Sequence, residues 1–352
     1  MKKQLFIAFS VIFLLSLALV GCSSSEETGS DSKAGSTSVL DKVKENGKLV
    51  AGVNGQLPGF GYVESDGSYT GFDVDYAKAI AAAVLGDAEA VEYRPLSAQE
   101  RFTAVQTGEV DVLIRNTTWT TSRDTGVGLN FAPTTFYDGQ GMMVPKDSGI
   151  TSLKDLEGAR IGVETGTTTE LNLADQMRKL GVNYTPVTFD SADAVVAAYE
   201  QGSVDAWTTD KSGLVSRKAI MADPDAHKIL AETMSKEPLG PAVIGGDDKW
   251  FDIVKWVVNA TIQAEELGIT SENVDEYLNS EDPVVRRLLG QDGDLGEQLG
   301  LNADFAYQVI KQVGNYGEIF ERHLGENSVF GLERGLNDLY TNGGLMYSPP
   351  FR

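Results

Sequence analysis

Cysteine and histidine are almost absent from this sequence. Its 352 residues include one cysteine, Cys22, and two histidines, His227 and His323. One chain therefore cannot assemble a disulfide framework, a cysteine nucleophile or a metal site with histidine and cysteine ligands. A magnesium or calcium site made only of carboxylates remains open. The acidic segment 292–297 lacks the spacing of an EF-hand and is interpreted as a turn.

Basic residues are also scarce. The chain has 29 Lys and Arg against 51 Asp and Glu, a net charge of −22, and no tract of clustered basic residues. Such a chain repels a polyphosphate backbone, so nucleic-acid binding is not expected. Apolar residues make up 41% of the chain, enough for a sizeable globular core. Nucleophile-elbow, Walker and dinucleotide-binding motifs are missing, and we expect small ligands or protein partners with basic patches.

A long apolar run occurs only at the N-terminus. Two lysines precede the run Leu5–Val20, which at about 1.5 Å per residue is too short to cross a bilayer core of about 30 Å. Residues 1–21 are therefore predicted to be a signal peptide. The run ends in Leu19-Val20-Gly21-Cys22, which resembles a bacterial lipobox. The resemblance implies that Cys22 is acylated, with palmitate, and becomes the new N-terminus. The alternative is a chance cysteine after an ordinary signal peptide.

The segment that follows is poor in apolar residues. Residues 23–38 are almost entirely Ser, Gly, Thr and charged residues, with Ala34 as the one apolar residue. Because such a segment can bury nothing, residues 22–38 are expected to form a flexible tether. A lipid anchor and a tether would hold the folded part at the outer face of a cell membrane. This fits an extracytoplasmic monomer that serves a membrane partner.

Beyond the tether, short apolar strands alternate with helical patterns. The expected strands include 48–53, 110–114, 159–163 and 204–208. The expected helices include 72–85, ended by Gly86, two that open at the capping boxes Ser97–Glu100 and Thr167–Glu170, and one from Trp250 to near Gly268, with helical patterns on to Leu339. This alternation predicts an α/β fold, and its recurrence predicts two lobes.

Two extended segments bounded by glycine and proline are expected to connect the lobes. They are 139–145 and 239–246, and neither has a helical period. Two such crossings would make a hinge, with a ligand cleft between the lobes. The first lobe is then expected to comprise residues 39–141 and 242–352, including the C-terminal helices, and the second lobe residues 142–241.

Ligands of open α/β sheets bind beyond the carboxyl ends of the strands. The strand that ends at Ile114 leads into Arg115–Arg123, where hydroxyls and two arginines suit a carboxylate, unless this is simply a solvated loop. In the other lobe, Thr167 and Thr168 begin a helix whose free N–H groups suit an anion. The alternative for Thr167 is a purely structural role as the N-cap of that helix. Asp210 follows a strand and could face an ammonium. Together these groups predict a site for a zwitterion.

Three further residues are candidates with open alternatives. Arg101 lies in the first turn of its helix, where a cation opposes the helix dipole, so a ligand role stands beside simple exposure. Phe60 and Tyr62 lie in the loop after the first strand. They either cover the apolar stem of a ligand or pack the loop itself.

The sequence resembles a known family at Gly71–Ile80. This segment closely resembles the signature of the family-3 extracellular solute-binding proteins, the polar amino-acid-binding proteins of bacterial ABC transporters, and departs only at Tyr76, where an aliphatic residue or Phe is usual. Segment 115–123, the turn Gly166–Thr168 and the ending Gly331–Arg352 resemble the larger general L-amino-acid-binding subgroup. The resemblance covers about residues 39–352. It implies a type II periplasmic-binding-protein fold that closes on an L-amino acid without a cofactor and delivers it to a permease and an ATPase.

The resemblance also implies how the α-carbon groups are held. Arg123 would bind the α-carboxylate, helped by Thr118 and the Thr168 amide. Asn116 and Asp210 would hold the α-ammonium.

The ligand side chain is less defined by the resemblance. Ser97 and Arg101 match positions that face the ligand side chain in glutamate/aspartate-binding relatives. A second arginine of those relatives is absent from residues 54–59. Either Arg115 replaces it, or the pocket accepts Glu, Asp, Gln, Asn and other amino acids.

Two other classes of function stay open. A few relatives with this fold are dehydratases of cyclohexadienyl acids, and Glu164 is the nearest candidate for the general acid that such an enzyme needs. A ligand-sensing module would have to act through a separate receptor, because the sequence has no attached kinase-like segment. A binding protein needs neither nucleophile nor metal, and we expect no enzymatic activity.

Overall fold

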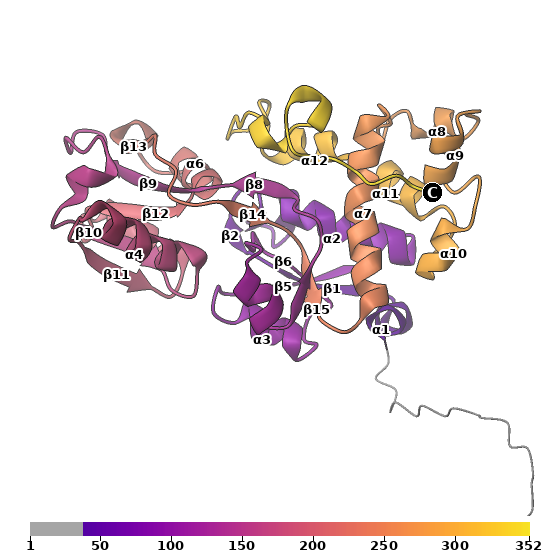
Figure 1. Ribbon diagram of the computed structural model, residues 1–352, viewed down its shortest axis with the longest axis horizontal. Coiled ribbons are helices and arrows are strands. Elements are labelled where there is room, and N and C mark those ends of the chain that lie inside the picture. Colours follow the sequence, from indigo (N-terminus) through magenta and orange to yellow (C-terminus); the bar gives the residue numbers. More distant parts are fainter. Residues whose placement is uncertain (1–37) are drawn as a thin grey trace, which may run out of the picture. The chain divides into compact units, whose positions relative to one another are not determined.

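The computed structural model describes residues 38–352. The expected signal peptide, Cys22 and the tether up to residue 37 lie outside the described residues. The described part is a mixed α/β protein with two sheet-containing lobes, as predicted (Figure 1). Every helix within residues 38–352 is too short or too polar to span a bilayer.

The first lobe is built on a five-stranded sheet in the order β5-β1-β6-β15-β7. Its strands are β1 (Leu49–Val53), β5 (Val91–Pro95), β6 (Val112–Ile114), β7 (Leu129–Phe131) and β15 (Ala242–Ile244). β1 is parallel to β5 and β6, whereas β15 is antiparallel to β6 and β7. Because β15 comes from beyond the second lobe in the sequence, the first lobe is discontinuous.

Helix α2 (Phe72–Leu85) is the buried centre of this lobe. It has the predicted bounds and ends at Gly86, which adopts the left-handed conformation with φ 74°. The helix packs on β1 and β6 and against the C-terminal helices, which explains why it is apolar on nearly all sides. Gly71 precedes it at φ 133°, where a side chain would collide with the Phe60 carbonyl. The remaining elements before the crossover are α1 (Val39–Asn46), β2 (Gln56–Leu57), β3 (Gly61–Val63), β4 (Tyr69–Thr70) and α3 (Arg101–Gln106).

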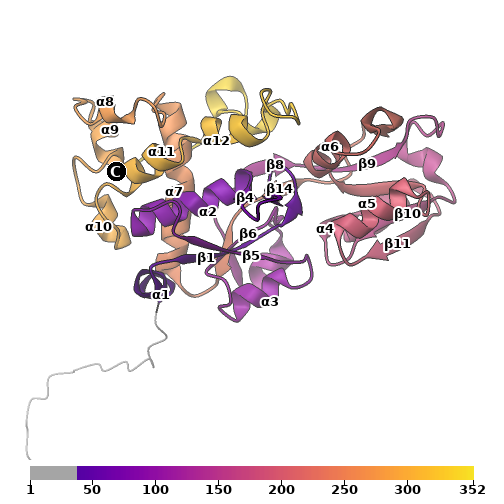
Figure 2. The same cartoon turned by 180° about the vertical axis from the view of Figure 1, so that it is seen from behind.

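A group of C-terminal helices completes the first lobe (Figures 1 and 2). These are α7 (Asp248–Glu266), α8 (Val274–Tyr277), α9 (Pro283–Leu288), α10 (Leu295–Leu299), α11 (Phe305–Gln312) and α12 (Tyr316–His323). The predicted apolar stripe of α7, which includes Trp250 and Val257, joins the core around α2. After His323 the chain forms mainly loops and two short 3-10 turns, so the expected helical continuation to Leu339 is wrong.

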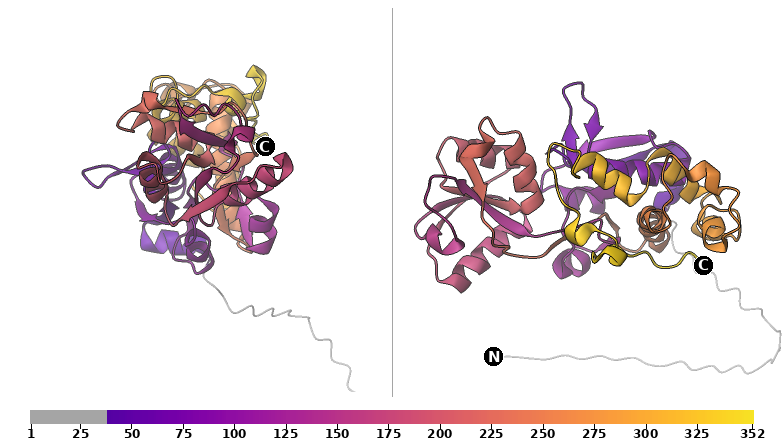
Figure 3. Two further views of the ribbon diagram at one scale, coloured as in Figure 1. Left: turned by 90° about the vertical axis from the view of Figure 1, so that its left-hand side faces the viewer. Right: turned by 90° about the horizontal axis from the view of Figure 1, so that it is seen from above.

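The second lobe contains another five-stranded sheet, in the order β11-β10-β12-β9-β13. Its elements are β9 (Gln140–Pro145), β10 (Arg160–Glu164), α4 (Thr168–Leu180), β11 (Thr185–Phe189), α5 (Ala192–Glu200), β12 (Ala206–Asp210), α6 (Lys211–Ala219) and β13 (His227–Ile229). Two hydrophobic clusters, separate from the core of the first lobe, pack this lobe. In the right-hand view of Figure 3 its strands and helices lie at one end of the molecule, and the orange C-terminal helices lie at the other.

Two strands carry the chain between the lobes. β8 (Phe136–Asp138) and β14 (Glu237–Leu239) pair antiparallel, with Glu237 opposite Asp138. The segment 139–145, expected as a connection, is instead mostly β9, which is bonded to β12 and β13 and buries Met142 and Met143. A boundary at residue 141 therefore falls inside a strand. The glycine-bounded pattern predicts a hinge at this segment, but its apolar side chains belong to the core of the second lobe.

Candidate functional site

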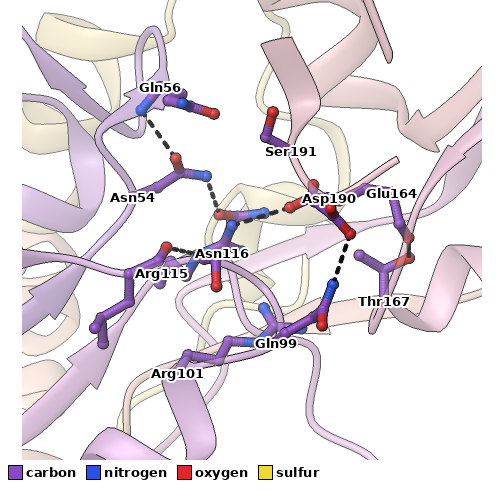
Figure 4. A network of polar contacts seen from close by, with 12 residues as sticks. Asn54, Gln56, Gln99, Arg101, Arg115, Asn116, Glu164, Thr167, Asp190 and Ser191 are labelled. Atoms are coloured by element: carbon purple, nitrogen blue, oxygen red, sulfur yellow. Dashed lines mark hydrogen bonds and ion pairs between the residues drawn. The ribbon is translucent and has the colours of Figure 1, made fainter. Parts of the chain in front are cut away.

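Polar groups of the two lobes meet where β6, β10 and β12 end. Thr118, which follows β6, lies 3.3 Å from Thr168 at the start of α4, measured between the two hydroxyl oxygens. Arg115 Nη2 lies 3.4 Å from Glu164 Oε1, and Gln99 donates to Asp190 across 3.2 Å (Figure 4). The structure thus brings the two segments that sequence analysis selected in different lobes into contact.

Three buried arginines lie on the first-lobe side of this contact. Arg115 donates from Nε to the Leu96 carbonyl at 2.7 Å, and burial lowers its pKa against the opposing effect of Glu164. Arg101, the first residue of α3, is 3% exposed, and its Nε has no hydrogen-bond partner within residues 38–352. Burial, together with the charges of Arg115 and Arg123, holds the pKa of Arg101 well below its ordinary value. Of the three arginines, Arg115 alone makes an ion pair with a carboxylate within residues 38–352.

Arg123 faces the first turn of α4. Its Nη1 donates to the Thr118 carbonyl at 2.9 Å, and burial lowers its pKa to about 10, opposed by Glu237 and Asp210. With Thr167 and Thr168 it lines a pocket of about 430 Å³. Thr167 is the predicted N-cap, since its hydroxyl accepts from the Glu170 N–H at 3.2 Å. The backbone N–H groups at this helix start point out of the helix and suit an anion.

Asn116 and Asp210 line one pocket between the lobes. Asn116 has φ 35° and is the one non-glycine residue with positive φ among residues 38–352. Its N–H donates to Asp73 at 2.7 Å, and its side-chain oxygen accepts from Asn54 at 3.0 Å, as Figure 4 shows for the Asn54 contact. A strained backbone held by two partners is typical of a functional site.

Asp210 is a buried carboxylate. It ends β12 and begins α6, and it is 7% exposed. Burial raises its pKa well above the ordinary value, and the neighbouring carboxylates Asp138 and Glu237 raise it further. Such a group favours a cation beside it, because a positive charge offsets the cost of holding the ionised form in a buried place.

Phe60 and Ser97 have different outcomes as predicted site residues. Phe60 is completely buried, with its ring centroid 5.1 Å from that of Phe136, so it belongs to the core of the lobe and is withdrawn from the candidate site. Ser97 lines a pocket of about 300 Å³ with Arg115 and Glu164. Its hydroxyl donates to the Glu100 carboxylate at 2.8 Å and accepts from the Glu100 N–H at 3.2 Å. These bonds lie in the turn before α3, which begins at Arg101.

Sequence analysis missed three residues that shape the site. Asp73 holds the backbone of Asn116, Asn54 holds its side chain, and Glu237 accepts hydrogen bonds from Thr118 and Thr168 at 2.7 and 2.8 Å. Asp73 lies within the signature segment, which could have drawn attention to it. Glu237 has no local signal, because its partners come from distant parts of the chain. No cluster of metal-binding side chains occurs in residues 38–352.

The family model of the bacterial extracellular solute-binding proteins, family 3, matches residues 49–326. The chain belongs to this family. It is 53% identical over 321 residues to the general L-amino acid-binding periplasmic protein AapJ of Rhizobium johnstonii, covering 91% of this chain and 94% of that protein. It is 50% identical over 320 residues to the glutamate/glutamine/aspartate/asparagine-binding protein BztA of Rhodobacter capsulatus, covering 91% and 95%.

Solved structures agree with this membership. An ABC transporter periplasmic binding protein from Brucella ovis with glutathione bound has a TM-score of 0.88 at 50% identity, covering 90% of this chain and all of that one. The cysteine-binding protein of Campylobacter jejuni has a TM-score of 0.60 at 27% identity, covering 71% and 97%. The predicted family and the type II periplasmic-binding-protein fold are confirmed.

Proposed function

We propose that this member of the solute-binding family is the extracytoplasmic amino-acid-binding component of an ABC importer and passes its ligand to a permease and an ATPase. The observation that carries the proposal is the charge arrangement of the cleft. Arg123, buried beside a helix start, and Asp210, a buried carboxylate of the opposite lobe, each make no ion pair within residues 38–352, although each influences the pKa of the other. An α-amino acid offers a charge opposite to each of them, on two groups bonded to the same carbon.

The ligand is held by groups from both lobes. Arg123 and the Thr168 N–H bind the α-carboxylate, with Thr118 beside them, and Asp210 and Asn116 bind the α-ammonium. Because these contacts come from both lobes, the ligand favours their approach about the β8 and β14 crossings.

The side-chain pocket suits polar amino acids. Arg115 and Ser97 line it, and the relatives AapJ and BztA bind general L-amino acids or the four amino acids Glu, Gln, Asp and Asn. We therefore propose a general polar specificity.

A γ-glutamyl peptide is a second candidate ligand. The Brucella ovis structure has glutathione bound, and glutathione presents the zwitterion of glutamate at one end. The pocket around Ser97 and Arg115 shares Asn54 and Glu164 with the pocket of Asp210. The two adjoining pockets offer space for a ligand that is longer than an α-amino acid.

The decisive experiment is a calorimetric titration of residues 23–352, stripped of ligand by unfolding and refolding, with the twenty L-amino acids and glutathione. Tight binding of several polar amino acids, lost in Asp210→Ala, supports the proposal. Absence of binding, together with turnover of prephenate or arogenate, would instead support the dehydratase alternative, in which Glu164 supplies the acid.

We also propose that the chain is a monomeric lipoprotein anchored through Cys22 to the bacterial cell membrane. The lipobox resemblance and the apolar run before it support this proposal. Growth with labelled palmitate should label the wild-type chain, whereas Cys22→Ser should lose the label and leave the membrane fraction. Equal labelling of both chains would contradict it.

A further inference from the structure

Glu237 is a buried carboxylate in the crossing strand β14. It is 1% exposed and accepts four side-chain hydrogen bonds. Its Oε2 accepts from the hydroxyls of Thr118 and Thr168 at 2.7 and 2.8 Å, and its Oε1 accepts from Asn172 and Ser235 at 2.7 and 2.5 Å.

These four donors come from three parts of the molecule. Thr118 follows β6 of the first lobe, and Thr168 and Asn172 lie on α4 of the second lobe. Ser235 precedes β14 in the crossing itself. A single carboxylate therefore joins both lobes at the hinge, next to the groups proposed to bind the ligand.

The bonds also fix the direction of the two threonine hydroxyls. A hydroxyl has one hydrogen to donate, and Thr118 and Thr168 both give theirs to Glu237. Towards a ligand these hydroxyls therefore present only lone pairs. A ligand carboxylate has to take its hydrogen bonds from Arg123 and from backbone N–H groups.

We infer that Glu237 is a positioning residue for ligand binding, which clasps Thr118 and Thr168 together across the hinge and so favours the closed arrangement of the lobes. The inference rests on the proposed function. Hydrogen bonds to an ionised acceptor are stronger than neutral ones, so the clasp depends on the carboxylate. Because apparent affinity scales with the population of the binding-competent state, a weaker clasp lowers affinity without removing any ligand contact.

Glu237→Gln tests the inference. One end of an amide is a donor, so it cannot accept from all four partners whichever way it is turned. We expect the affinity for L-glutamine and L-glutamate, measured by calorimetry, to fall about tenfold or more, and the radius of gyration of the ligand-free protein, measured by X-ray scattering, to increase. A lower melting temperature with unchanged affinity and unchanged radius would overturn the inference.

A double-mutant cycle separates positioning from a general structural effect. Thr168→Val removes the hydroxyl but keeps the backbone N–H. If Glu237 acts through Thr168, adding Thr168→Val to Glu237→Gln should cost little further affinity, whereas additive losses would overturn the inference. Glu318→Gln is the matched control. Glu318, like Glu237, accepts from a serine hydroxyl, but its other donors are backbone N–H groups and it lies at the start of α12. Glu318→Gln should lower the melting temperature and leave the ligand affinity unchanged. If it lowered the affinity as much as Glu237→Gln does, the inference would be overturned.

Two further measurements keep the test decisive. If Glu237→Gln does not fold, Glu237→Asp keeps the charge but shortens the reach, and should weaken binding and enlarge the ligand-free protein in the same way. If the wild-type protein binds none of the amino acids, the proposed function fails. The comparison of ligand-free radii still tests the clasp.

Discussion

Arg334, after the C-terminal helices, and Arg101 and Arg123, in the cleft, all place their guanidinium groups over aromatic rings. Arg334 lies over Tyr316 and Phe320, at 5.1 and 5.0 Å from the ring centroids. Arg101 and Arg123 lie over Phe102, at 4.8 and 5.1 Å. The stacking is the same in both regions, but the charge partners differ.

Arg334 has a dedicated counter-charge. It makes two hydrogen bonds to Glu265, at 3.0 and 3.1 Å. Burial lowers its pKa, but these bonds and the charges of Glu265, Tyr316 and Asp338 together raise the pKa above its ordinary value. The pKa values of the cleft arginines are lowered instead. The first arrangement stabilises the folded chain, whereas in the second Arg101 and Arg123 make no ion pair within residues 38–352, which fits the anionic ligand group proposed above.

The largest expected effect is that of Arg123→Ala. If Arg123 binds the ligand carboxylate, its loss leaves that carboxylate buried without its partner, which costs about 2–5 kcal/mol, so affinity should fall by about thirtyfold to several thousandfold. Calorimetry with the preferred amino acid measures this. Thermal unfolding of the ligand-free variant should show a smaller loss of stability than Arg334→Ala, because Arg123 makes no ion pair within residues 38–352 and loses only its bond to the Thr118 carbonyl and its contact with Phe102. Near-normal affinity would refute the proposed carboxylate site.

Arg334→Ala should show the opposite pattern. The substitution leaves Glu265 without its partner in a largely buried place, so we expect a loss of about 3 kcal/mol in the free energy of unfolding. Ligand affinity should stay the same. Denaturant unfolding and calorimetry on one preparation give both values. A drop in affinity as large as that of Arg123→Ala would erase the distinction between the two regions.

The same question of a missing counter-charge arises for the buried carboxylates, whose contribution to stability depends on pH. Burial raises the pKa of Asp73 to about 7, against the opposing effects of the Asn116 N–H and Arg115. The folded protein then holds a proton that the unfolded chain, with an ordinary pKa of 3.8, has lost. This contribution to stability is complete below about pH 4 and is lost as the pH rises towards 7, with a slope of at most about 1.4 kcal/mol per pH unit.

Asp73→Asn should remove this slope. The variant keeps an oxygen for the Asn116 N–H, so it should equal the wild type at pH 4 and become the more stable of the two at pH 7. Unfolding in denaturant at a series of pH values measures the difference. Asp155→Asn is the control of opposite sign, because hydrogen bonds from Thr151 and Ser152 lower the pKa of Asp155. The stability that ionised Asp155 contributes to the folded protein is lost as the pH falls below about 4. Parallel curves for wild type and Asp73→Asn would contradict the argument.

The sequence predicted the parts of this molecule that depend on neighbours along the chain. Helix α2 with its end at Gly86, the cap at Thr167 and the apolar stripe of α7 follow from short-range patterns. The membership of β9 in the second sheet could not be predicted, because pairing with β12 and β13 decides it.

The same distinction holds for the candidate site. Arg115 and Asp210 were found from their places at strand ends. Glu237 and Asp73 were missed, because their hydrogen-bond partners lie far away in the sequence. Of the two alternatives for Phe60, the structure supports packing, because Phe136 from the crossing strand β8 lies against its ring in the core.

The smallest expected effect is that of Arg101→Met. Arg101 is buried, the charges of Arg115 and Arg123 act on it, and its Nε has no hydrogen-bond partner within residues 38–352, so in the ligand-free protein its charge is a cost rather than a gain. An apolar side chain of similar length should keep the contact with Phe102 and raise the free energy of unfolding by about 1 kcal/mol. If Arg101 faces the ligand side chain, binding of L-glutamate should weaken more than binding of L-glutamine. Thermal unfolding and calorimetry with both amino acids measure the two effects. If Arg101→Met lowered the free energy of unfolding and weakened the binding of both amino acids equally, Arg101 would, like Arg334, stabilise the fold and not contact the ligand side chain.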